Sequence, residues 1–229
     1  MDTMMTSGEA WSWAALLILG AFHGINPGMG WLFAVALGMQ EQKERAVWRA
    51  LLPLTAGHAL AIAGVLLAAA MIGTAIPTGP LQWLVGVLLL ALGGYRLVRC
   101  RHPRFGGMRV GARDLTIWSF LMASAHGAGL MVLPFVLGMT GAMAQEAGPH
   151  HGHAAHIGAA AAGASDGLMA AAGATLVHTV GYLAVTAVVA WIVYRHVGLG
   201  LLRRAWVNLD LVWAVALIVT GIVAIGMAS

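Results

Sequence analysis

Four histidines lie near the middle of long apolar stretches of this 229-residue chain, where no Asp, Glu, Lys or Arg occurs: His23, His58, His126 and His178. A neutral imidazole suits nickel, cobalt, copper and zinc, whereas magnesium and calcium require oxygen ligands. We therefore predict that these residues bind a transition-metal ion. The alternative for each is a hydrogen-bonded histidine with a structural role in a packed core.

Three further side chains near the histidines could add ligands. Asn26 could supply an oxygen, and Met29 and Met131 each offer a thioether shortly after His23 and His126. Thioethers would favour copper(I), but methionines in apolar helices more often fill packing gaps. The central parts of the apolar stretches contain no carboxylate, so a bound ion would keep its positive charge, which favours passage over permanent retention.

A second group of histidines occurs in the glycine- and alanine-rich segment 140–167. Its imidazoles fall within seven residues: His150, His151, His153 and His156. Short histidine-rich tracts of this kind are typical of loose metal binding. We expect the segment to be a mobile external loop that captures the metal, and a polar spacer is the alternative.

The elements that must position these residues are membrane helices. Of the chain, 60% is hydrophobic and 9% charged, against about 25% charged in a soluble domain. The stretches long enough to cross a bilayer cover 13–37, 48–72, 80–98, 115–139, 168–194 and 208–228. We predict an all-α polytopic membrane protein with one transmembrane domain over 1–229. This class excludes soluble enzymes and nucleic-acid-binding proteins.

The distribution of positive charge predicts the orientation. All 12 Lys and Arg residues lie at the end of, or after, the first, third and fifth stretches. By the positive-inside rule these loops face the cytoplasm, which places both termini outside in a multi-pass protein of the inner membrane. Most of the nine tryptophans lie near the ends of the stretches, as in interfacial belts.

The two halves of the chain, 13–98 and 115–228, resemble each other weakly. Ala21-Phe22-His23-Gly24 corresponds to Ser124-Ala125-His126-Gly127, and His58 and His178 lie in the middle stretch of each half. Three crossings per half make the second half inverted, an arrangement that places substrate sites near the midplane. The four histidines lie within about 5 Å of that depth along their helices, so we expect them to share one cavity.

These features resemble the small six-helix nickel/cobalt permeases of the NicO and HupE/UreH type, within the LysE- and CcdA-like transporter group. The resemblance rests on His23, Pro27, Gly28 and His126, together with the histidine-rich segment. It implies nickel or cobalt as the transported ion and His23 and His126 as ligands. Those permeases typically carry an Asp-His pair near the first histidine, where this chain has Asn26 as the nearest polar residue.

We therefore expect a transporter that passes nickel or cobalt, with copper or zinc as alternatives, through a midplane histidine site. Its partners would be the metal ion and the lipid bilayer, and a homo-oligomer or a larger membrane complex is compatible with the sequence. Enzymatic activity stays open: one alternative is an intramembrane metalloenzyme with the metal held by the same histidines. Further alternatives are a non-catalytic membrane subunit and a permease for a small organic solute.

Overall fold

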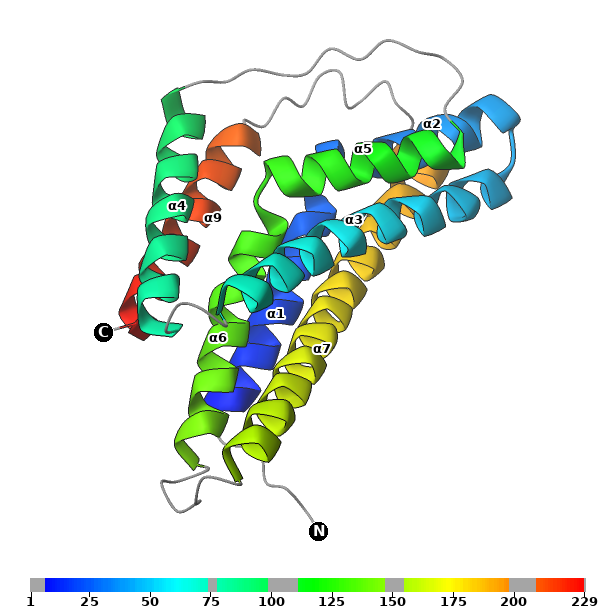
Figure 1. Ribbon diagram of the computed structural model, residues 1–229. Helices are drawn as coiled ribbons and strands as arrows, with labels where there is room; N and C mark the ends of the chain where they lie inside the picture. The colour runs from blue at the N-terminus through cyan, green and yellow to red at the C-terminus, as the bar shows by residue number, and fades with distance from the viewer. Residues whose placement is uncertain (1–6, 74–77, 99–110, 147–154, 198–208, 229) are drawn as a thin grey trace.

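The computed structural model describes residues 7–73, 78–98, 111–146, 155–197 and 209–228, and all its regular elements in these ranges are helical (Figure 1). This confirms the all-α prediction for the described residues. The elements are α1 (Ser7–Ile25), the 3-10 turn η1 (Pro27–Met29), α2 (Trp31–Glu41), α3 (Glu44–Gly73), α4 (Thr78–Val98), α5 (Ala112–Ala125), α6 (Ala128–Glu146), α7 (Ala155–Ile192), the π-helical turn η2 (Val193–Val197) and α9 (Leu209–Ala228).

Membrane-spanning character is concentrated in a few of these helices. Within the described ranges, Glu44–Met71 and Asp166–His196 are long and apolar enough to cross a bilayer, and the bent pair α5 and α6 counts as a third crossing if it is one span. The apolar parts of α1, α4 and α9 are shorter, at 10–17 residues. The structure thus supports a membrane protein with two or three crossings by this criterion, fewer than the six that the sequence predicts.

The first predicted span, 13–37, is not one continuous helix. It is divided by Asn26–Gly30 into α1 and α2. Pro27 has no N–H and restricts Asn26 to an extended conformation, which ends α1. Gly30 has a φ of 121°, a value that side chains with a Cβ rarely adopt.

The predicted span 115–139 is also divided. Helix α5 ends at Ala125, α6 begins at Ala128, and their axes differ by 61°. Gly127 has a φ of 72° and therefore turns the chain at this point. The segment 140–167, predicted as a loop, is helical at both ends, because α6 continues to Glu146 and α7 begins at Ala155.

Close helix pairs are built on small residues. Helices α1 and α7 run side by side, and a Cβ on Gly24 would lie 2.6 Å from the carbonyl oxygen of Tyr182. Helices α3 and α5 pair in the same way, where a Cβ on Gly57 would lie 2.9 Å from the amide nitrogen of Phe120. Such small residues let helix backbones approach closely.

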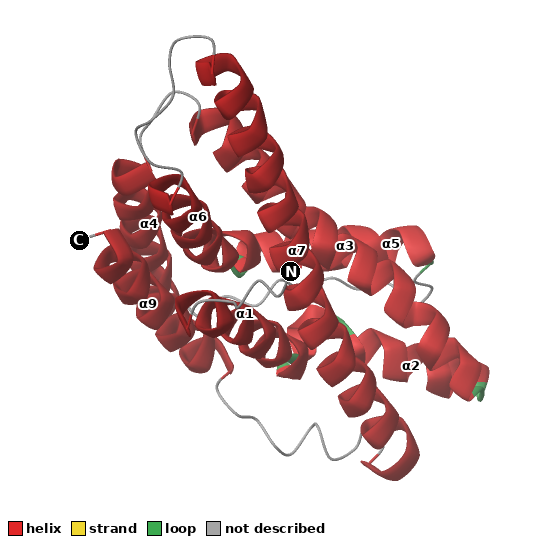
Figure 2. Cartoon of the chain, turned by 90° about the horizontal axis from the view of Figure 1, so that it is seen from below, coloured by secondary structure: helices red, strands yellow, loops and turns green. Residues whose placement is uncertain are grey.

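The helices form three groups. In Figures 1 and 2, α4 and α9 lie on one side, α2, α3 and α5 lie on the other, and α1, α6 and α7 lie between them. The α4–α9 pair contacts the rest of the bundle chiefly through α6. One large apolar core unites α1, α3, α6 and α7.

A separate, smaller core lies where α2, α3, α5 and η2 meet. Exposed ion pairs join the same elements, with 3.2 Å between Arg195 and Glu44 and 3.6 Å between Arg49 and Glu41. We call this part of the molecule the basic end. Helix α1 begins, α6 ends and α7 begins at the opposite end (Figure 1).

Candidate functional site

Three of the four predicted histidines meet in the interior of the bundle. The ring centroids of His23 on α1 and His178 on α7 are 4.9 Å apart, and each ring lies 5.5 Å from that of His58 on α3. All three side chains are completely buried. We call His23, His58 and His178 the histidine triad.

The fourth histidine, His126, caps the C-terminus of α5 and is also buried. It lies close enough to His23 for the charge of one ring to affect the other. The two residues make the same backbone contact, because the Nδ1 atoms of His23 and His126 lie 2.9 Å and 2.7 Å from the carbonyl oxygens of Leu19 and Met122, one turn earlier. A carbonyl only accepts, so Nδ1 carries the proton and Nε2 carries the lone pair in both neutral rings.

The other two rings are held differently. Neither ring nitrogen of His58 has a hydrogen-bond partner, although both are buried. The carbonyl of Leu16 lies beside His178, but not in hydrogen-bonding geometry. His58 instead stacks on the ring of Tyr182, with centroids 4.0 Å apart and planes inclined by 11°. A buried polar atom without a partner costs about 1–3 kcal/mol, so its retention calls for a functional reason.

The break between α1 and α2 is fastened by side chains from other parts of the fold. The indole nitrogens of Trp31 and Trp118 donate to the carbonyls of Ile25 (3.0 Å) and Gly28 (3.2 Å). The hydroxyl of Tyr182 donates to the Met29 carbonyl at 2.8 Å. Carbonyls freed by a broken helix therefore find donors inside the protein, as they must in a membrane.

The additional predicted ligands occupy defined positions outside the triad. The side-chain oxygen of Asn26 accepts a hydrogen bond from the Gly28 amide at 2.8 Å and caps η1. Met29 and Met131 are completely buried and belong to the large apolar core. The structure therefore gives Asn26 a capping role and both methionines a packing role.

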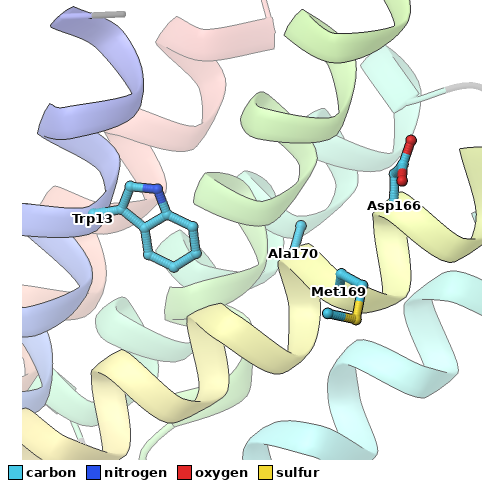
Figure 3. A pocket seen from close by; sticks show the side chains of 4 residues that line it. All are labelled: Trp13, Asp166, Met169 and Ala170. Carbon is cyan, nitrogen blue, oxygen red and sulfur yellow. The ribbon is translucent and has the colours of Figure 1, made fainter. Parts of the chain in front are cut away.

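Most of the predicted capture histidines cannot be placed relative to the triad. His150, His151 and His153 lie outside the described residues, and His156 falls in the first turn of α7. Near this end of the molecule, Trp13 of α1 and Asp166, Met169 and Ala170 of α7 line a shallow surface pocket of about 270 Å³ (Figure 3). It lies two to three helical turns from the triad along both helices.

The triad is not arranged as a finished coordination sphere. Within the described ranges, no three His, Cys, Asp or Glu side chains are placed to hold a metal ion together. The rings of His58 and His178 are nearly parallel, with an interplanar angle of 7°, so they stack rather than converge. Coordination would require rotation about χ2, which has a broad energy profile in histidine.

Sequence reasoning missed three residues of this region. Tyr182 was not singled out, although it follows His178 by one helical turn and therefore shares its face. Trp31 and Trp118 were assigned to an interfacial belt, but they hydrogen-bond to the first helix break and Trp31 is buried. Only their proximity to Pro27 or to the second half's histidine motif could have hinted at these roles.

Comparisons of the chain with protein families, with characterised proteins and with solved structures found no match.

Proposed function

We propose that this protein is a multi-pass membrane transporter that passes a transition-metal cation through the histidine triad, with His126 as a fourth imidazole. The observation that carries the proposal is the meeting of three buried imidazoles from three different helices within 5.5 Å. Nickel or cobalt is the proposed cargo, and copper or zinc is the alternative, because neutral imidazole suits all four.

The tautomers of His23 and His126 support coordination. Metal-binding histidines almost always donate their second ring N–H to a carbonyl or carboxylate, which fixes the orientation of the ring. The contacts of both Nδ1 atoms with backbone carbonyls fit this arrangement. In this tautomer, Nε2 is the ring nitrogen with the lone pair that a metal ion binds.

The unsatisfied nitrogens of His58 also support a ligand. Ring stacking and burial leave both nitrogens without a hydrogen bond. A cation or a polar substrate in the triad would supply the missing partner. No hydrogen bond holds the ring, so turning toward an arriving ion would cost His58 its stacks on Tyr182 and His178 rather than a hydrogen bond.

The lack of nearby acidic groups favours transport over permanent binding. None of the Asp or Glu side chains whose burial is described is buried. An ion on neutral imidazoles would therefore keep its full charge in a low-dielectric interior, which limits affinity. Metalloenzymes with dinuclear sites in helix bundles generally use several carboxylates instead.

The proposal includes six crossings in two inverted halves with external termini. Corresponding pairs of helices support it: α1 packs on α7 and α5 on α3, and α2 packs on α3 and α6 on α7. Both halves also contain a break that follows a histidine and includes a glycine with positive φ. Broken helices around a central site are typical of inverted-repeat transporters.

Metal accumulation in cells tests the proposal. We expect His58→Ala and His178→Ala each to lower nickel or cobalt accumulation about tenfold or more, since loss of even a supporting group typically costs 10- to 100-fold in affinity. His196→Ala is the matched control, because His196 is exposed at the basic end. Membrane abundance of each variant is measured in parallel. Equal accumulation in all variants at equal abundance contradicts the proposal.

A second candidate function is a permease for a small organic solute, with the histidines as hydrogen-bonding groups. The stacked rings of the triad favour it, because they do not converge on one point as metal ligands do. X-ray absorption spectroscopy of the purified protein with added nickel separates the two. Several imidazole ligands in the first shell support the metal transporter. A spectrum of hydrated nickel alone supports the solute permease.

A further inference from the structure

A layer of hydroxyl and carbonyl groups adjoins the histidine triad. The Tyr182 hydroxyl donates to the Met29 carbonyl at 2.8 Å, and the hydroxyls of Ser119 and Thr186 adjoin it. Ser119 in turn donates to the Leu54 carbonyl at 2.6 Å. We call Met29, Leu54, Ser119 and Tyr182 the tyrosine layer. It joins the first helix break to α3, α5 and α7.

Three residues of this layer, Met29, Leu54 and Tyr182, lie on the same side of the triad. Tyr182 follows His178 on the way to Arg195, and Met29 follows His23 on the way to α2. Helix α3 passes Leu54 before His58 as it leaves the basic end. The tyrosine layer therefore lies about one helical turn, or roughly 5 Å, from the triad toward the basic end.

The opposite side of the triad is closed by apolar side chains. Leu16, Ile62 and Ala174 are completely buried and belong to one cluster. Each lies one to two turns from its helix's histidine, away from the basic end. The triad is thus closed on both sides, by apolar side chains on one side and by the interhelical hydrogen bonds of the tyrosine layer on the other.

We propose that Tyr182 is the gate between the triad and the basic end, and that its hydrogen bond to Met29 holds the gate shut. This inference rests on the proposed function. The stack of Tyr182 on His58 links the gate to the site, because His58 must turn to offer a ring nitrogen to a substrate. Turning breaks the stack and so removes one of the contacts that hold the Tyr182 ring, while its hydrogen bond to Met29 stays. An occupied site therefore favours the open gate.

Sided thiol labelling tests the gate without any metal. In a Cys100→Ser background, Ala61→Cys places a thiol one turn beyond His58, away from the basic end, at a position that is 3% exposed. Vesicles of both orientations, with a chelator present, are treated with a membrane-impermeant, positively charged methanethiosulfonate. Tyr182→Phe keeps the ring but removes the hydroxyl, so we expect labelling from the basic end to be about three- to tenfold faster. Labelling from the opposite end should not change.

Tyr194→Phe is the matched control, because it removes a hydroxyl from the same chain segment beside Gly38, away from the triad. An unchanged rate in Tyr182→Phe, or an equal rise from both ends, overturns the gate, since general loosening of the fold has no sidedness. If Tyr182→Phe does not reach the membrane, Ser119→Ala takes its place. It should give a smaller rise in the labelling rate from the basic end alone, and an unchanged rate likewise overturns the gate. Metal accumulation in the histidine variants is measured separately, so either proposal can fail while the other stands.

Discussion

The two helix breaks occupy corresponding positions in the two halves, but they are held in different ways. The first, Asn26–Gly30, has carbonyls that accept hydrogen bonds from Trp118 on α5 and Tyr182 on α7. The second turns within two residues, with hydrogen bonds from the His126 and Gly127 amides to carbonyls of the preceding turn. Side chains from distant parts of the chain thus fasten the first break, whereas the second also has hydrogen bonds within its own turn.

This difference indicates which break can transmit movement. A break whose carbonyls are bound by distant side chains changes when those side chains move, and one of them stacks on a triad histidine. Under the proposed function, we therefore expect substrate binding to act on the first break rather than on the second.

The largest expected effect comes from the glycines of the two breaks. Gly30→Ala forces a Cβ into a backbone with φ of 121° and against the buried side chain of Leu54. We expect it to lower the free energy of unfolding by about 3 kcal/mol, the sum of backbone strain and overpacking. Gly127→Ala, with φ of 72° and its nearest contact a terminal methyl of Leu217 at 3.2 Å, should cost about 1–2 kcal/mol.

Reversible unfolding of the purified protein in mixed micelles measures both values. Gly64→Ala is the matched control, because a Cβ at this position on α3 would meet nothing within 4 Å. If Gly30→Ala is tolerated as well as Gly64→Ala, the first break is not rigidly fastened and the contrast between the breaks is lost.

The next largest effect is expected at His58, and it distinguishes a ligand role for this residue from a structural role. His58→Leu removes two buried nitrogens that lack partners, a gain of about 1–3 kcal/mol that loss of the stack on Tyr182 partly offsets. We therefore expect a more stable protein that no longer accumulates metal. Thermal stability in detergent and cellular accumulation are the two measurements.

His196→Leu provides the comparison, since the same change at an exposed position should leave stability nearly unchanged. A less stable His58→Leu protein would indicate that the imidazole has a structural partner and would remove one support for a ligand.

The smallest expected effect tests the role of Asn26. Its side chain caps η1 through the Gly28 amide, so Asn26→Ala should lower the free energy of unfolding by about 1 kcal/mol. Asn26→Ser restores a capping oxygen and should recover most of the loss. If both variants lose metal accumulation while stability is restored in Asn26→Ser, Asn26 contacts the cargo directly.

Much of the site was predictable, because histidines are rare in apolar stretches and their depth can be estimated from span length. On this basis His23, His58 and His178 were expected to be neighbours, and their rings do lie together. The same reasoning did not predict the break after His126, since a single glycine within an apolar helix is common in membranes. It also missed Tyr182, because its partner Met29 lies 153 residues away in the chain.

The sequence by itself determined the helical class, the apolar character and the clustering of positive charge, whereas the common depth of four imidazoles stays a prediction. Only the tertiary structure decided which rings meet, which tautomers they adopt and which side chains fasten the first break. The physical reason is that a helix apolar on all sides, such as α7, carries no pattern that distinguishes a lipid-facing side chain from an interior one. Its rotation about its own axis is set by close contacts at residues such as Gly24 and Gly181, which form only when the helices pack.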